Sequence, residues 1–166
     1  MSPFLDRVLG GWQLSGINTV TPGEQVNFTY TPSAAFNVSS IRDSWRGANN
    51  YRPNVTCDPY APEGERSLTN WFNKSCVSVP TDPSQPFGNA ERNSVRGRGF
   101  WQFDLAAVKQ VTLPGTARIE LRVETFNLLN RVNFQAPNAN RSLPTFGTIT
   151  NTFAPRQVQL GARVSW

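Results

Sequence analysis

The chain has 166 residues, of which only 16% are charged and 38% are hydrophobic, and it carries 13 prolines and 12 glycines. This composition argues against a helical bundle and favours one all-β domain with long polar loops. The net charge is +5, and because the arginines are scattered along the chain, nucleic acid is not an expected partner.

Histidine is absent, which excludes catalysis by Ser-His-Asp or Cys-His groups and every metal site that needs histidine. The two cysteines are too few for a four-thiolate zinc site. We therefore expect no catalytic residue, no cofactor and no metal, and a protein that is not an enzyme.

No stretch of 18 apolar residues is present, so the sequence predicts no transmembrane helix, although membrane-barrel strands are shorter and only half apolar. The first ten residues are too short and too polar for a signal peptide. Cys57 and Cys76 nevertheless favour an exported protein, and we expect a disulfide worth about 3 kcal/mol, with two free thiols as the alternative. This conflict predicts the C-terminal part of a longer protein, with Met1 as an internal or misassigned start.

Five runs alternate between apolar and polar residues, as strands with one apolar face do. They cover residues 10–21, 23–31, 100–113, 116–127 and 157–166. In the first run the pattern loses its phase between Leu14 and Ile17, and glycines weaken it further. The dipeptides Pro22-Gly23 and Pro114-Gly115 predict tight hairpin turns after the first and third runs.

The other two connections are long and cover residues 32–99 and 131–155. A compact soluble domain rarely holds irregular connections of this length. Short and long connections alternate in antiparallel membrane barrels, which have short periplasmic turns and long extracellular loops. The sequence therefore predicts an antiparallel up-and-down meander of about five strands in the bacterial outer membrane, with both Pro-Gly turns on the periplasmic side.

Each strand of a membrane barrel turns one face to lipid, which offers no hydrogen bonds, and the other face to the lumen. The expected lipid-facing side chains are Trp101, Phe103, Leu105, Ile119, Leu121, Val123, Val158, Leu160 and Val164. The expected lumen-facing side chains are Asp104, Arg118, Glu120, Arg122, Glu124, Gln159 and Arg163. Trp101 and Trp166 are expected near opposite membrane interfaces.

The charged residues 118–124 have two interpretations. They line a ligand path, or they form a wall of mutually paired charges that contacts neighbouring strands or a plug domain. A catalytic carboxylate pair is disfavoured because Glu120 and Glu124 would lie about 13 Å apart along a strand, with Arg122 between them to keep both ionised.

Two features of the long connection also have alternatives. Arg92, Arg96 and Arg98 either meet lipopolysaccharide phosphates at the outer rim or lie on a solvated loop. Trp71 and Phe72, close to Cys76, are expected to pack the loop upon itself.

Several segments resemble one family of membrane proteins. PRQVQLGARVSW, residues 155–166, resembles the closing strand of TonB-dependent outer-membrane transporters, and most of all the Oar-like subgroup of acidobacteria, which carries a carboxypeptidase-regulatory-like domain. RVETFNLLNRVNF, residues 122–134, is similar to that subgroup's penultimate strand. Other similar segments are FGNAERNSVRGRGFWQFDLAAVK, FGTIT and GGWQLSG, so the resemblance runs from Gly10 to Trp166. The family usually ends in Phe, and Trp166 retains an aromatic residue for the barrel-assembly machinery.

The resemblance implies energised uptake through a barrel of 22 strands filled by a plug. Residues 1–166 would supply about five of those strands, an incomplete segment of the barrel wall. The implied partners are the rest of the barrel and its plug, the TonB energy-coupling complex, the barrel-assembly machinery, membrane lipid and lipopolysaccharide. The transported substrate does not follow from these residues, because the plug and the loops select it.

Two other classes fit parts of the pattern. A secreted β-sandwich, either an adhesin or a carbohydrate-binding module, would pack apolar faces in two layers. An outer-membrane enzyme would need a nucleophile site, and the sequence offers none. A single sheet with a bare apolar face distinguishes the barrel segment from the sandwich.

Overall fold

The computed structural model describes residues 8–32, 51–82 and 84–166. These residues form two compact units. The first, which we call the sheet unit, comprises residues 8–21, 100–133 and 153–166, and the second, the loop unit, comprises residues 22–32, 51–82, 84–99 and 134–152. In the described ranges no helix is long and apolar enough to cross a membrane.

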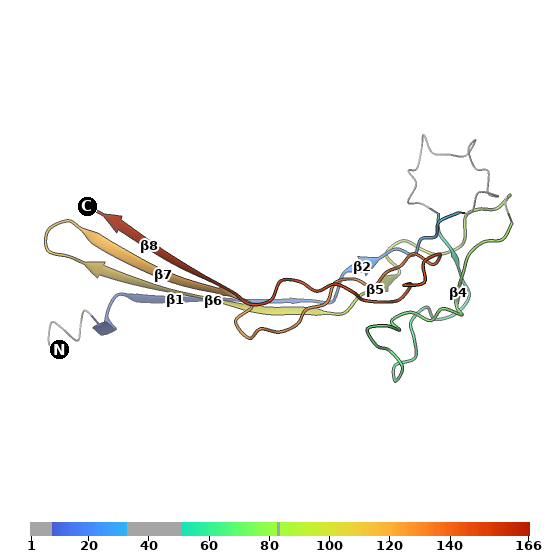
Figure 1. The fold of residues 1–166 in the computed structure, drawn as a ribbon, viewed down its shortest axis with the longest axis horizontal. Helices are drawn as coiled ribbons and strands as arrows, with labels where there is room; N and C mark the ends of the chain where they lie inside the picture. Colours follow the sequence, from blue (N-terminus) through green and yellow to red (C-terminus); the bar gives the residue numbers. More distant parts are fainter. Residues whose placement is uncertain (1–7, 33–50, 83) are drawn as a thin grey trace. The chain divides into compact units, whose positions relative to one another are not determined.

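The sheet unit is built on four antiparallel strands in the order β1-β6-β7-β8 (Figure 1). The strands are β1 (Trp12–Thr21), β6 (Phe100–Thr112), β7 (Arg118–Phe126) and β8 (Gln157–Ser165). Neighbours in the sheet follow one another along the chain as long strands, so the expected all-β, antiparallel meander is confirmed. The sheet is open, with β1 at one edge and β8 at the other.

Pro114 and Gly115 form the tight turn between β6 and β7. Gly115 has a φ of 88°, a left-handed conformation that residues with a Cβ adopt only under strain. The backbone N–H of Leu113 donates to the carbonyl of Ala117 at 2.9 Å and closes the turn. The second predicted hairpin turn is therefore present.

The predicted strand over Gly23–Thr31 is wrong as a member of this sheet. Only β2 (Gln25–Val26) is formed there, and it pairs with β5 (Val95–Arg96) in the loop unit. Pro22-Gly23 is not a hairpin turn, because β1 pairs with β6 rather than with the segment that follows it. Val26, Phe28 and Tyr30 alternate as in a strand because all three side chains are buried in the loop unit.

The connections between the four long strands therefore have different bounds from those that the sequence predicted. The first long connection begins at Pro22, not at residue 32, and ends at Gly99, while the second joins Phe126 of β7 to Gln157 of β8. Thr21 pairs with Phe100 and Phe126 pairs with Gln157, so both long connections leave the same end of the sheet. The turn at Pro114-Gly115 lies at the opposite end, so the two Pro-Gly dipeptides do not share one end.

The loop unit has a hydrophobic core of its own, although each of its strands has only two residues. Besides the β2–β5 pair, β3 (Asn54–Val55) pairs with β4 (Val77–Ser78). The rings of Phe28, Phe72 and Phe146 contact one another in the core, with centroids 4.8–5.6 Å apart. The remaining core residues are Val26, Val77, Ala90 and Val95.

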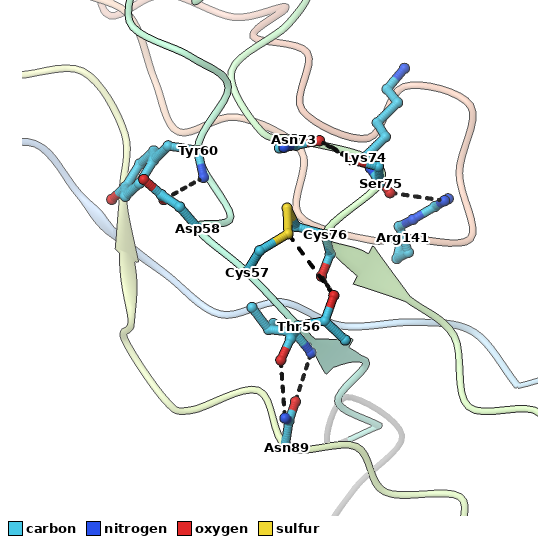
Figure 2. The surroundings of a disulfide bond; sticks show 11 residues. Thr56, Cys57, Asp58, Tyr60, Asn73, Lys74, Ser75, Cys76, Asn89 and Arg141 are labelled. Carbon is cyan, nitrogen blue, oxygen red and sulfur yellow. Dashed lines mark hydrogen bonds between the residues drawn. A yellow bond between two sulfur atoms is a disulfide. The ribbon is translucent and has the colours of Figure 1, made fainter.

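A disulfide joins Cys57 and Cys76, whose Cα atoms lie 5.1 Å apart, beside the β3–β4 pair (Figure 2). The N–H of Thr56 donates to the carbonyl of Cys76 at 3.0 Å. On the other side of β3, the Asn89 side chain accepts the Val55 N–H and donates to the Val55 carbonyl. Phe72, within the disulfide loop, is fully buried: it contacts Tyr60 of the same loop, but it also packs against Phe28 and Phe146 outside the loop, which therefore folds upon itself only in part.

Residues 134–152 are part of the same core, although they belong to the second long connection. Thr29 forms a parallel bridge with Asn140. The Trp71 N–H donates to the carbonyl of Gly147 at 2.9 Å, and Arg141 donates from Nε to the carbonyl of Val77 at 2.6 Å. The two connections therefore fold as one unit rather than as two separate loops.

Replacing Phe72 with Ala should destabilise the loop unit by about 3–5 kcal/mol, because it leaves a cavity between two other aromatic rings. Phe87→Ala is the matched control: Phe87 is 43% exposed, and its loss should cost about 1–2 kcal/mol. Amide hydrogen exchange of the loop residues under oxidising conditions measures both. Equal costs for the two variants would contradict the assigned core.

Candidate functional site

The two faces of the four-stranded sheet carry different side chains. Residues directly opposite one another in an antiparallel pair project to the same face, so the register assigns every position. Leu121 lies opposite Lys109 and Ala162, and Val123 lies opposite Ala107 and Leu160. This face, which we call the apolar face, holds all nine side chains predicted to face lipid: Trp101, Phe103, Leu105, Ile119, Leu121, Val123, Val158, Leu160 and Val164.

The opposite face, which we call the polar face, holds all seven side chains predicted to face the lumen. Glu120 lies opposite Gln110 and Arg163, and Glu124 lies opposite Ala106 and Gln159. The seven are Asp104, Arg118, Glu120, Arg122, Glu124, Gln159 and Arg163. The sequence pattern and the pairing register therefore agree on how every one of these side chains is grouped.

The apolar face is not covered by a second layer of strands in the sheet unit. Leu160 is 75% exposed, and Leu121, Val123, Val158 and Val164 are exposed as well. A β-sandwich would bury these side chains under a second sheet. Among the described residues the other sheets have only two strands of two residues each, so the β-sandwich alternative is wrong.

Ile17 of β1 lies opposite Asp104 on the polar face, so the loss of phase in the sequence is real, but β1 still contributes alternate residues to the apolar face. Trp12, Leu14 and Val20 lie on this face, and so does Asn18, opposite Phe103. The Asn18 amide oxygen accepts the indole N–H of Trp101 at 2.8 Å. This bond satisfies both polar groups within the apolar face, so the strand keeps its regular pairing there.

A tryptophan stacked against a cation lies near each end of the apolar face. Toward the turn end, Lys109 Nζ lies 5.3 Å from the centroid of the Trp12 ring and donates to the carbonyls of Val8 and Gly10. Toward the loop end, the Arg131 guanidinium lies 5.1 Å from the Trp101 ring. Lys109 is only 8% exposed, whereas Arg131 is exposed.

Charge pairing dominates the polar face of β7. The Arg122 guanidinium donates to Glu120 Oε1 at 3.2 Å and to Glu124 Oε1 at 3.3 Å. Each contact is partly exposed to solvent and contributes little on its own. The arrangement matches the interpretation of a wall of paired charges.

Two shallow hollows lie on the polar face. One, of about 230 Å³, is lined by Arg118, Glu120 and Arg163 among others. The other, of about 140 Å³, lies between β1, β6 and β7, with Asp104 and Glu124 at its wall. The first hollow has a mainly polar lining that a polar solute or protein segment could contact, whereas the second, which also includes Ile17 and Phe126, has a mainly apolar lining. Among residues 8–32, 51–82 and 84–166, no group of three or more His, Cys, Asp or Glu side chains could hold a metal ion.

Two buried asparagines, which the sequence reasoning missed, complete the sheet beyond β7. Asn133 accepts the Trp101 N–H at 3.0 Å and donates to the Trp101 carbonyl at 2.9 Å, so its side-chain amide replaces a strand partner. Asn127 has a φ of 53° and both accepts from and donates to the backbone of Arg131. The Asp104 carboxylate accepts the Asn127 N–H at 2.8 Å and fixes this turn.

The signal for these asparagines was visible in the sequence. Asn127, Asn130 and Asn133 follow β7 at intervals of three residues, and asparagine is among the residues that tolerate a left-handed backbone and bond to nearby peptide groups. Trp166, the expected assembly signal, follows β8 at the turn end and is almost fully exposed. It therefore lies at the end of the sheet opposite to Trp101.

The comparisons with known proteins give one match. A family model described as "Outer membrane beta barrel domain" matches residues 2–159. No curated protein and no solved structure matches the chain.

Asn133→Ala should destabilise the sheet unit by about 2–4 kcal/mol, because it leaves both backbone groups of Trp101 without their partner. Asn133→Asp should cost a similar amount, since its carboxylate accepts from the Trp101 N–H but repels the Trp101 carbonyl. Unfolding in urea, followed by tryptophan fluorescence in the bilayers where the protein folds, measures the cost. Val132→Ala, at an exposed neighbouring position, should cost less than about 1 kcal/mol, and a similar loss in this control would refute the assignment.

Proposed function

Because this chain belongs to the outer membrane β-barrel domain family, and so lies in the bacterial outer membrane, we propose that it forms part of the wall of a TonB-dependent transporter. In this proposal the apolar face contacts lipid and the polar face lines the lumen. The barrel serves energised uptake of a large or scarce substrate, and the chain catalyses no reaction.

The observation that carries this proposal is the consistent division of the two faces across four strands. Leu121, Leu160 and their neighbours would gain free energy in hydrocarbon, where they need no hydrogen-bond partner. Arg122 with its two glutamates would remain hydrated and paired in the lumen. The opposite orientation would place at least seven polar or charged side chains of these strands in lipid.

The spacing of the two tryptophan–cation pairs supports a membrane crossing. Trp101 and Lys109 lie eight residues apart on β6, about 27 Å along a strand. A strand tilt of about 40° reduces this to about 21 Å along the membrane normal, close to the apolar band of about 25 Å in outer-membrane barrels. Trp12 and Trp101 would lie at the two interfaces, where amphipathic aromatic rings are favoured.

The two open edges of the sheet define the partners in this proposal. In lipid the unpaired backbone groups of β1 and β8 need neighbours, because an open edge there is strongly unfavourable. The rest of the barrel would supply them, and its plug would contact the polar face. The barrel-assembly machinery would recognise Trp166, which follows the last residue of β8.

The finer assignment to energised transport rests on the likeness of residues 122–134 and 155–166 to TonB-dependent transporters of the Oar-like subgroup. The short turn and the two long connections also fit periplasmic and extracellular sides, respectively. The loop unit would then be the part of the chain that meets solutes outside the cell.

Leu105→Arg should hinder assembly of the parent barrel by about 2–4 kcal/mol, because it places a charge on the lipid side midway between Trp101 and Lys109 on β6. Gln159→Arg, on the polar face opposite Glu124, should have a much smaller effect. Folding into lipid vesicles, measured by heat-modifiable migration in gels, compares the two variants. Equal effects would reverse or remove the proposed orientation of the sheet.

Energised uptake predicts a shared phenotype. A strain that lacks this protein and a strain that lacks the energy-coupling complex should both lose growth on the same limiting nutrient, tested one nutrient at a time. A nutrient that requires this protein but not the energy-coupling complex would indicate a passive barrel instead.

A further inference from the structure

Five side chains of the loop unit stack in alternating aromatic and cationic order, an arrangement that we call the ladder. Its members in order are Tyr60, Arg66, Trp71, Arg98 and Phe134. The Arg66 guanidinium lies 4.8 Å from the Tyr60 ring and 5.6 Å from the Trp71 ring. Arg98 lies 6.0 Å from the Trp71 ring and 5.2 Å from the Phe134 ring. Both guanidinium groups are thus stacked between two aromatic rings.

The disulfide loop holds the first three members of the ladder. Tyr60, Arg66 and Trp71 all lie between Cys57 and Cys76, and the Asp58 carboxylate accepts the Tyr60 N–H beside the disulfide (Figure 2). The Trp71 indole N–H donates to the carbonyl of Arg96 at 2.9 Å, and the Tyr60 hydroxyl accepts the N–H of Arg96 at 2.6 Å. The ladder is therefore fixed before any ligand arrives.

The edges of the two guanidinium groups remain available. Both arginines are exposed. Arg66 uses Nε and one terminal nitrogen to donate to the carbonyl of Ala61, and among the described residues its other terminal nitrogen has no partner. In the described part of the chain, Arg98 makes no side-chain hydrogen bond, and neither arginine pairs with a carboxylate.

Two cations that are fixed by stacking, and that have no carboxylate partner in the described part of the chain, favour an anionic ligand. The distances to the shared Trp71 ring place the two guanidinium carbons within about 12 Å of each other. A planar guanidinium binds carboxylate and phosphate groups through two parallel hydrogen bonds, and stacking reduces the entropy lost on binding. The nearby Arg96 side chain, which is also exposed, adds a third positive charge.

We propose that the ladder is a binding site for a soluble ligand with two or more phosphate or carboxylate groups, which Arg98 and Arg66 bind together. This inference rests on the proposed function, in which the loop unit meets solutes outside the cell. It extends that function by giving the class of ligand that is captured first.

The test measures tripolyphosphate binding by calorimetry, with the protein that carries this chain in nanodiscs of uncharged phosphatidylcholine. We expect saturable binding that weakens as salt is raised. Arg98→Gln should weaken it about tenfold or more, which is the effect of losing a charged hydrogen-bonding partner. Arg98→Lys should give an intermediate loss, since it keeps the charge but not the planar fork.

Arg92→Gln is the matched control, because Arg92 is an exposed arginine of the same unit outside the ladder. It should leave the affinity within about twofold. Reduction of the disulfide should weaken binding as well, because it releases Tyr60, Arg66 and Trp71 from their fixed positions. Maltotriose, an uncharged ligand, should not bind at this site.

Three results would overturn the proposal. The first is an unchanged affinity in Arg98→Gln with folding confirmed by circular dichroism. The second is an equal loss in Arg92→Gln, which indicates nonspecific charge attraction. The third is Arg98-dependent binding to discs of anionic phosphatidylglycerol with no binding of tripolyphosphate, which assigns the ladder to a lipid surface. Membrane folding of Leu105→Arg and Gln159→Arg is independent of all three, so failure here leaves the barrel-wall proposal standing.

Discussion

Peptide groups in hydrocarbon must be bonded to other peptide groups or to side chains that imitate them, and the sheet unit depends on this constraint. Along β1, β6, β7 and β8 the antiparallel register meets it residue by residue. β7 ends at Phe126, and the first residues of β6, from Phe100 onward, extend beyond the pairs that it forms with β7. The Asn133 amide takes the place of the missing peptide opposite Trp101, and the Asp104 carboxylate accepts the N–H of Asn127.

The same constraint explains how polar side chains persist on the apolar face. Asn18 would be costly there without a partner, and the Trp101 indole supplies one. Lys109 extends to the carbonyls of Val8 and Gly10, so its charge is solvated by the backbone that precedes β1. Both residues lie beside a tryptophan, near an end of the apolar face rather than in its middle. Polar groups and aromatic rings thus mark the limits of the apolar band together.

The sequence predicted the grouping of side chains better than the pairing of strands. Alternation along β6, β7 and β8 was sufficient because each strand has one apolar face over at least nine residues. Residues 23–31 show the same alternation for a different reason, since Val26, Phe28 and Tyr30 are buried in the core of the loop unit. Period alone does not distinguish a side chain on the bare face of a sheet from one buried in a protein core. The ladder joins residues from three segments that are distant in the sequence, so no local sequence pattern predicts it.

The shared core of the two long connections has a consequence for the order in which the protein matures. Thr31 and Ser142 exchange hydrogen bonds although they are 111 residues apart, whereas the disulfide spans a sequence separation of only 19. The local crosslink can form as soon as residue 76 reaches an oxidising compartment. The core around Phe28 and Phe146 cannot form until residues 134–152, which follow the β6–β7 hairpin in the chain, are also present in that compartment. Contacts of such high sequence separation form slowly, so we expect the crosslink to form before the shared core closes.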